Sequence, residues 1–238
     1  MPGFAARLVH DTMDRTLARN VIVALLFALL LAASGSAQEQ TDGGRTSGVY
    51  RIDAARSDIR LLVYRAGVLA RFGHNHVISV GEFEGTITLH SDPERSSVEL
   101  EIPVHGLIVD DPELRIEEGD EFSSDLSEAD INRTRGNMLG GRVLNAEQYP
   151  IVRIMGRGFA VERQEVKLSL SVELLGRVIE LSAPVALRLD GDELEASGAL
   201  RVSHAMLGMT PFKAAFWALR VADEMDLKFR IRARRVRD

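Results

Sequence analysis

The chain has 238 residues, a formal net charge of −6, 45% hydrophobic residues and 27% charged residues. This is the composition of a globular protein with one large domain or two small ones. The sequence contains no cysteine, which excludes disulfides, thiolate metal centres, cysteine nucleophiles and cysteine-linked lipid anchors. The acidic charge and the 5% aromatic content argue against nucleic-acid binding, which needs clustered Lys and Arg or stacking aromatic side chains.

The first 37 residues have the three parts of a secretory signal. Basic residues precede an unbroken apolar run over residues 21–33, and Gly35 and Ala37 supply the small residues that a signal peptidase recognises. The alternative, an uncleaved membrane anchor, needs about 20 apolar residues, and this run is shorter. We therefore expect cleavage near Ala37. A flexible polar leader would follow over residues 38–48, and a single domain over residues 49–238.

From Tyr50 onward, apolar and polar residues alternate with a period of two. Side chains on a strand point alternately to opposite faces, so each alternating run predicts a strand with one dry face. The expected strands lie around residues 59–63, 83–89, 98–104, 166–172, 179–189, 194–202 and 225–231. Turn residues separate several of them, at positions 91–93, 175–176, 190–192 and 222–224.

One stretch has the signals of a helix. Ser127 is a typical N-cap, Asp130 lies in the first turn, and Gly140 and Gly141 end the segment, so we predict a helix over residues 128–139. Parallel strands would need a crossover helix for each pair, so one helix among many strands indicates an antiparallel sheet. The predicted fold class is all-β: a closed antiparallel β-barrel with one short helix inserted in a long connection.

The size of the inward residues bears on whether this barrel is hollow. A barrel of about eight strands is either filled by its own side chains or holds one small ligand. Several inward positions carry small residues, among them Gly85, Ala196 and Gly198. Small inward residues favour an apolar cavity, which suits an apolar ligand. Spacing does not measure the remaining volume, so a structural protein with a filled core stays open as an alternative.

The order of several segments resembles the YceI-like family. These segments are residues 50–53, 56–57, 81–85 with 87, 143–150, 168–170 with 176, 207–209 and 219–227. The resemblance covers about residues 49–233 and implies a lipocalin-like barrel in the periplasm whose cavity binds a polyisoprenoid or similar lipid, without catalysis. The chain departs from the common pattern at Arg56, after Gly176 and in the long acidic segment 110–127, and these departures bear on the identity of the lipid.

A histidine pair is the most reactive motif in the chain. His74 and His76 would project from one face of an extended segment and share a metal ion, or they would hydrogen-bond at the barrel rim. A zinc, copper or iron ion needs further ligands, which only folding can bring, from Glu82, His105 or His204. We predict polar rim roles for His74, His76 and His204. A metal-binding protein or metal-dependent enzyme built on His74 and His76 is the alternative function.

Residues 204–217 are rich in Met and aromatic residues, which give an adaptable apolar lining, and residues 212–217 also suit a lid over one end of the barrel. Together with inward strand residues they form the predicted lipid-contacting set: Leu61, Val63, Phe72, Phe83, Val98, Leu100, Leu168, Leu170, Met206, Met209, Phe212, Phe216 and Trp217. No cofactor is predicted, because an isoprenoid or quinone-like lipid would be a ligand. The predicted partners are this lipid and, transiently, the membrane surface; no nucleic acid is expected, and a homodimer stays open.

Two charged segments complete the sequence. Asp110, Asp111 and the acidic run over residues 113–121 could hold calcium, but they lack the ligand spacing of an EF-hand loop, so we predict a solvated loop. The arginines among residues 230–237 predict a terminal edge strand whose outward charges prevent pairing with another sheet.

Overall fold

The computed structural model describes residues 47–162, 165–214 and 219–237. The chain divides into two units, residues 1–41 and 42–238, and all the described residues belong to the second unit. The expected signal segment and nearly all of the expected leader therefore lie outside the described residues. Within the described ranges, no helix is both long enough and apolar enough to cross a membrane.

The described fold consists mostly of strands. The strands are β1 (Gly48–Ile52), β2 (Asp58–Ala66), β3 (His76–Val80), β4 (Glu84–Leu89), β5 (Ser97–Pro103), β6 (Leu107–Val109), β7 (Ile151–Glu162), β8 (Glu165–Leu174), β9 (Arg177–Asp190), β10 (Glu193–Ser203), β11 (Lys213–Ala214) and β12 (Leu219–Arg235). The α-helices are α3 (Pro112–Glu117) and α4 (Glu128–Leu139).

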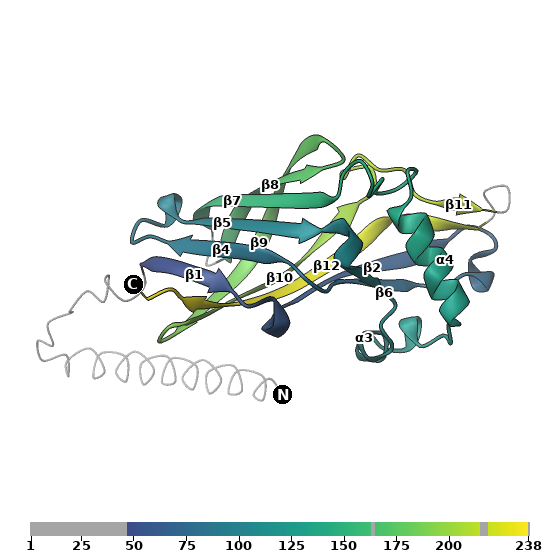
Figure 1. Ribbon diagram of the computed structural model, residues 1–238, viewed down its shortest axis with the longest axis horizontal. Coiled ribbons are helices and arrows are strands. Elements are labelled where there is room, and N and C mark those ends of the chain that lie inside the picture. The colour runs from purple at the N-terminus through teal and green to yellow at the C-terminus, as the bar shows by residue number, and fades with distance from the viewer. Residues whose placement is uncertain (1–46, 163–164, 215–218, 238) are drawn as a thin grey trace, which may run out of the picture. The chain divides into compact units, whose positions relative to one another are not determined.

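Eight of these strands close a barrel in the order β1-β4-β5-β7-β8-β9-β10-β12, and β12 pairs with β1 to complete the ring. The neighbouring strands of this ring are antiparallel. The predicted all-β, closed antiparallel barrel is therefore confirmed. Figure 1 shows β1 and α4 toward opposite ends of this barrel.

The long strand β12 closes the barrel in two steps. Its last part pairs with β1, as in Ile52 with Ala233, and its earlier part pairs with β2, as in Ile59 with Phe229. Beyond β2 the sheet continues through β3 to β6. The barrel therefore has a ring of eight strands at the β1 end, which we call the closed end. At the α4 end, β2, β3 and β6 form part of the wall.

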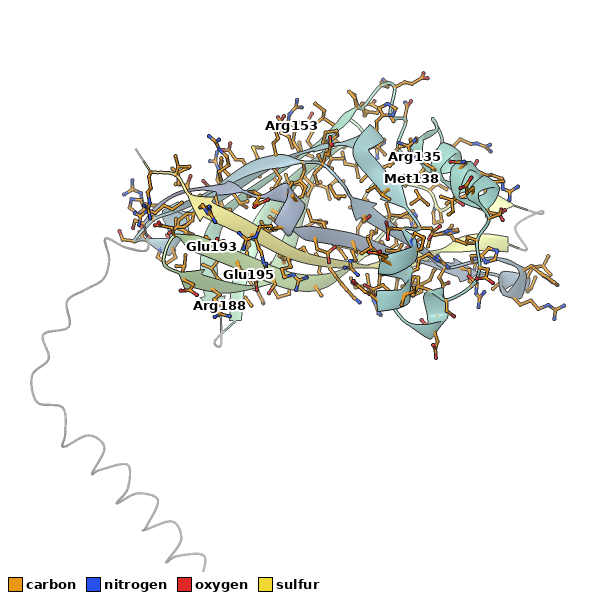
Figure 2. The ribbon with its side chains drawn as sticks, turned by 60° about the horizontal axis from the view of Figure 1, so that its bottom comes forward. Arg135, Met138, Arg153, Arg188, Glu193 and Glu195 are labelled. Atoms are coloured by element: carbon orange, nitrogen blue, oxygen red, sulfur yellow. The ribbon has the colours of Figure 1, made fainter. Side chains whose placement is uncertain are left out.

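This arrangement corrects two predictions about the C-terminal region. β12 is hydrogen-bonded on both sides, so it is not an edge strand, and its arginines pair with acidic residues of β10. A guanidinium nitrogen of Arg232 lies 3.0 Å from a carboxylate oxygen of Glu195, and one of Arg234 lies 2.9 Å from one of Glu193. Figure 2 labels both glutamates, which lie on β10. The expected turn at residues 222–224 is also wrong, because β12 continues through it with only a register irregularity between Val221 and Met225.

The alternating pattern gives the strands their two faces. In β5, Val98, Leu100 and Ile102 are buried, whereas Glu99 and Glu101 are exposed. The β8–β9 and β9–β10 hairpins turn at the predicted positions, where Gly176 and Gly191 have φ of 70° and 60°, conformations that glycine adopts without strain. The predicted strands therefore follow directly from the period of two.

The sequence analysis predicted one of the two described α-helices. α4 spans the expected residues, and the Ser127 side chain accepts a hydrogen bond from the Asp130 N–H. The expectation of a single helix in a solvated acidic connection is wrong, because α3 also forms there. Asp111 caps α3 by accepting from the N–H groups of Glu113 and Leu114, at 2.9 and 3.2 Å.

The closed end of the barrel has a solid core. Its buried residues include Tyr50, Phe83, Ile87, Leu100 and Leu194. The small inward residues here do not leave a void, because larger side chains from neighbouring strands lie over them. A Cβ on Gly198 would lie only 2.6 Å from Cζ of Phe229, so the ring of Phe229 already fills that space. The cavity that small inward residues predict is therefore absent at this end of the described barrel.

Candidate ligand-binding cavity

The other end of the barrel contains a cavity of about 680 Å³. This volume lies in the range of small-molecule binding sites, roughly 300–1,000 Å³. Its wall is formed mainly by aliphatic side chains from β2, β3, β7, β8, β10 and β12, with α4 contributing from one side. The barrel is therefore solid at the β1 end and hollow at the α4 end.

The register of the strands orders the cavity wall in rows. His76, Val63, Met225 and Val202 lie opposite one another on β3, β2, β12 and β10, and all four line the cavity. The next inward row contains Ile78, Leu61 and Leu227, which also line it. One row deeper, Ile59 lines the cavity, whereas its partner Phe229 packs against the solid core. The cavity is therefore polar only toward the α4 end and becomes aliphatic with depth.

The structure divides the predicted lipid-contacting set. Five of its members line the cavity: Leu61, Val63, Phe72, Met209 and Phe212. Four lie in the solid core of the closed end instead: Phe83, Val98, Leu100 and Leu168. Leu170 packs against this solid core and also against a second cluster of buried apolar residues. Met206 is 52% exposed. Phe216 and Trp217, in the second half of the suggested lid, lie outside the described residues. Contact with a lipid stays a prediction for the whole set.

Several cavity residues escaped the sequence analysis. The largest group is on α4 and in the segments beside it, and includes Leu126, Thr134, Asn137, Met138 and Val143. Figure 2 labels Met138 together with Arg135 on this helix. Arg135 donates a hydrogen bond of 2.6 Å to the backbone carbonyl of His105, which ties α4 to the segment before β6. Residues 128–139 are mostly polar, so hydrophobic periodicity gave no signal for a helix that forms a cavity wall.

The three histidines predicted at the rim, His74, His76 and His204, all line this cavity. His74 and His76 do not share a partner, because Nδ1 of His74 lies 3.2 Å from Oγ of Ser124 and Nδ1 of His76 lies 2.6 Å from Oδ2 of Asp110. His204 is buried, and its Nδ1 lies 3.1 Å from the carbonyl oxygen of Asp223 on β12.

Behind His76 lies a buried ion pair that the sequence analysis missed. Asp110 is 1% exposed, and its carboxylate accepts hydrogen bonds from Arg115 at 2.6 Å and from the Val77 N–H at 3.0 Å. Arg115, on α3, also donates to the Asn75 carbonyl and to Ser124. We call Asp110, Arg115, His76 and Ser124 the buried network. It connects α3 to the strand that carries His76.

The electrostatics of this network keep Asp110 ionised. Burial would raise the pKa of Asp110, but the hydrogen bond and charge of His76, the Val77 N–H and the Arg115 guanidinium outweigh burial and hold it below its ordinary value. The expectation of a solvated acidic loop is therefore wrong for Asp110 and Arg115. Asp111-Pro112-Glu113, an N-cap followed by Pro at the first helical position, was the signal that could have revealed α3.

The candidate metal ligands do not converge. Among the described residues, no three His, Asp or Glu side chains are grouped so that they could hold a metal ion. Glu82 and His105, two of the suggested additional ligands, are exposed. The geometry gives His74, His76 and His204 separate protein partners.

Comparison with known proteins places this architecture among solved structures. BcnA of Burkholderia cenocepacia aligns with a TM-score of 0.55 and 16% identity, over 76% of this chain and 99% of BcnA. A polyisoprenoid-binding domain from Saccharophagus degradans, implicated in plant cell wall breakdown, aligns with a TM-score of 0.51 and 14% identity, over 79% of this chain and 98% of the domain. The chain has the fold of a polyisoprenoid-binding domain.

This is the fold that the resemblance to the YceI-like family implies, so that expectation is confirmed. A YceI protein of Campylobacter jejuni also aligns, with a TM-score of 0.45 and 10% identity, over 67% of this chain and 85% of that protein. No protein-family model and no curated protein sequence matches the chain.

Proposed function

We propose that this protein binds a long apolar lipid of isoprenoid type in the cavity at the α4 end, and that it sequesters or carries the lipid rather than modifying it. The observation that carries this proposal is an aliphatic cavity of about 680 Å³ in a barrel whose other end is solid. Burial of hydrocarbon in such a cavity contributes about 0.8 kcal/mol for each CH₂ group. The name of the Saccharophagus domain supports an isoprenoid ligand.

The direct test is to extract the protein, purified from its own host, with organic solvent and to identify the extracted lipid by mass spectrometry. We expect about one prenyl lipid per protein molecule. A matched pair of variants tests the location. Val63→Trp fills the cavity and should weaken lipid binding about tenfold or more, whereas Val178→Trp, at a 66% exposed position on β9, should leave it unchanged.

A contact with the membrane surface is part of this proposal, because a carrier must exchange its lipid with a bilayer. The segment between β2 and β3 offers such a contact. Val68 is 87% exposed, and Phe72 is 63% exposed while also lining the cavity. Arg71 in this segment and Arg65 near the end of β2 are both exposed, and the segment has no acidic residue. Arg71 lies over the Phe72 ring at 4.7 Å. Exposed apolar side chains beside cations suit an anionic lipid surface.

We place the protein in the periplasm. The support is the N-terminal sequence, with its short apolar run and small residues before the expected cleavage site at Ala37. Fractionation of the host, with N-terminal sequencing of the mature protein, tests this location. Recovery of an uncleaved chain in the cytoplasm would contradict it.

A further inference from the structure

The hydrogen bonds of two cavity histidines fix which ring nitrogen carries the proton. Nδ1 of His204 lies 3.1 Å from the carbonyl oxygen of Asp223, and a carbonyl only accepts, so Nδ1 is the donor. Nδ1 of His76 lies 2.6 Å from the Asp110 carboxylate, which accepts from Arg115 as well. Nδ1 of His76 is therefore also a donor. In a neutral imidazole, the second nitrogen, Nε2, then has a free lone pair.

Both Nε2 atoms are available to the cavity. Neither has a hydrogen-bond partner within the part of the chain that the structure describes, and both histidines line the cavity. His204 is only 6% exposed. Among the described residues, however, every side-chain nitrogen or oxygen that is completely buried has a hydrogen-bond partner. Nε2 of His204 therefore opens onto the cavity and is not enclosed by protein.

Some of the charges near these nitrogens are compensated, and two further cations that line the cavity, Arg65 and Arg220, are exposed. Behind His76, Asp110 and Arg115 neutralise each other. On α4, Asp130 and Arg133 form an ion pair, and Arg133 is largely exposed. In their neutral form, these two imidazoles therefore offer a ligand hydrogen-bond acceptance at Nε2. An ether oxygen, which only accepts, finds no donor in these two atoms, whereas an O–H group finds an acceptor.

We propose that the polar end of the cavity selects lipids whose head group donates a hydrogen bond, such as a prenyl alcohol or a hydroquinone, over the corresponding ether or carbonyl. This inference rests on the proposed lipid-binding function and adds the chemistry of the head. His76 and Val202 lie in one row, three interstrand steps or roughly 14 Å apart along the wall, and His204 follows Val202 by two residues. A hydroxyl has one proton to donate, so it donates to one of the two histidines at a time.

The test compares two probes that differ only in the donor, geranylgeraniol and its methyl ether, by displacement of a fluorescent dye from the purified protein at pH 8. We expect the alcohol to bind about fivefold more tightly, which is the value of one net hydrogen bond. The informative variants are His76→Asn and His204→Asn, singly and together. An asparagine amide can replace the Nδ1 donor and keep its anchor, but it has no atom at the position of Nε2.

The double variant should bind the alcohol and the ether equally, and its retained binding of the ether shows that the cavity remains intact. His204→Gln, whose amide oxygen can occupy the place of Nε2, is the rescue control and should retain any preference that depends on His204. Equal affinities for both probes in the wild type would overturn the head-group proposal and leave lipid binding standing. A preference that survives in the double variant would also overturn it. Failure of both probes to bind would refute the proposed function itself.

Discussion

Replacement of Asp110 by asparagine tests the buried network most directly. Asn keeps the shape of the side chain and tolerates the backbone conformation at this position, where φ is 57°. It removes the charge that Arg115 faces at 2.6 Å, and Arg115 is 6% exposed. Removal of one partner from a buried ion pair costs about 3–5 kcal/mol, because the other charge stays buried without compensation. We expect the cost of Asp110→Asn to lie near the lower limit of this range, because neutral hydrogen bonds to the amide remain.

The assay is urea unfolding followed by far-UV circular dichroism. For a domain of this size, a loss of about 3 kcal/mol should also lower Tm by roughly 6–12 °C. In the double variant Asp110→Asn with Arg115→Met, the uncompensated charge is gone, so we expect recovery of at least about half of the loss. A cost below about 1 kcal/mol for Asp110→Asn, or a double variant that merely adds the two single effects, would refute the role of the buried charge.

The pH dependence of this variant has a definite sign. The pKa of Asp110 lies below its ordinary value of 3.8 in the folded protein, so the unfolded chain binds a proton first as the pH falls. The stability contributed by its carboxylate is therefore complete above the unfolded value and is lost as the pH falls through the folded one. The difference in stability between the wild type and Asp110→Asn should be constant near neutral pH and shrink in acid below about pH 4.

Two further predictions separate the two ends of the barrel. At the closed end, Gly198→Ala should destabilise the protein by about 1–3 kcal/mol without a change in lipid affinity, because the new Cβ would lie 2.3 Å from the Pro184 carbonyl oxygen. Its control is Gly136→Ala on α4, which has open space around the new Cβ and should stabilise the protein by about 0.5–1 kcal/mol. Urea titration measures both changes in stability. An equal effect of the two substitutions would contradict the close packing around Gly198. At the α4 end, Val68→Asp should weaken binding to anionic vesicles about tenfold in a flotation assay. Ile116→Asp, at a 77% exposed position on α3, should not, and equal losses would remove the case for a specific membrane contact.

The sequence predicted well what local chemistry decides. α4 has the predicted bounds because Ser127 caps its start and Gly140 follows its end. The hairpin turns at Gly176, which adopts its φ of 70° without strain, and the preceding Leu175 also has a positive φ of 53°. The turn expected at residues 222–224 failed because a tertiary contact prevails over local preference. The carbonyl of Asp223 accepts from both the backbone N–H and the Nδ1 of His204, within a strand paired on both sides.

The position of the cavity was beyond sequence reasoning, because it depends on which side chains meet across the barrel. Gly198 suggested empty space, but Phe229 on the neighbouring strand fills it. Leu100 and Leu61 alternate inward on their strands in the same way, yet the first packs in the solid core and the second lines the cavity. Periodicity identifies the inward face of a strand, whereas depth along the barrel decides whether an inward side chain meets another one.

The division between a solid and a hollow end also explains why a costly ion pair lies beside the cavity. A hollow core loses the contacts that would otherwise hold its walls. At this end β6 has three residues and, among the described strands, pairs only with β3. The buried network supplies the missing constraint from outside the barrel, because Arg115 on α3 fixes Asp110, and Asp110 fixes both the Val77 N–H and the His76 ring. A polar network can hold a wall in place without occupying the volume that it encloses. The protein can thus keep its cavity open for a ligand while the closed end supplies most of its apolar packing.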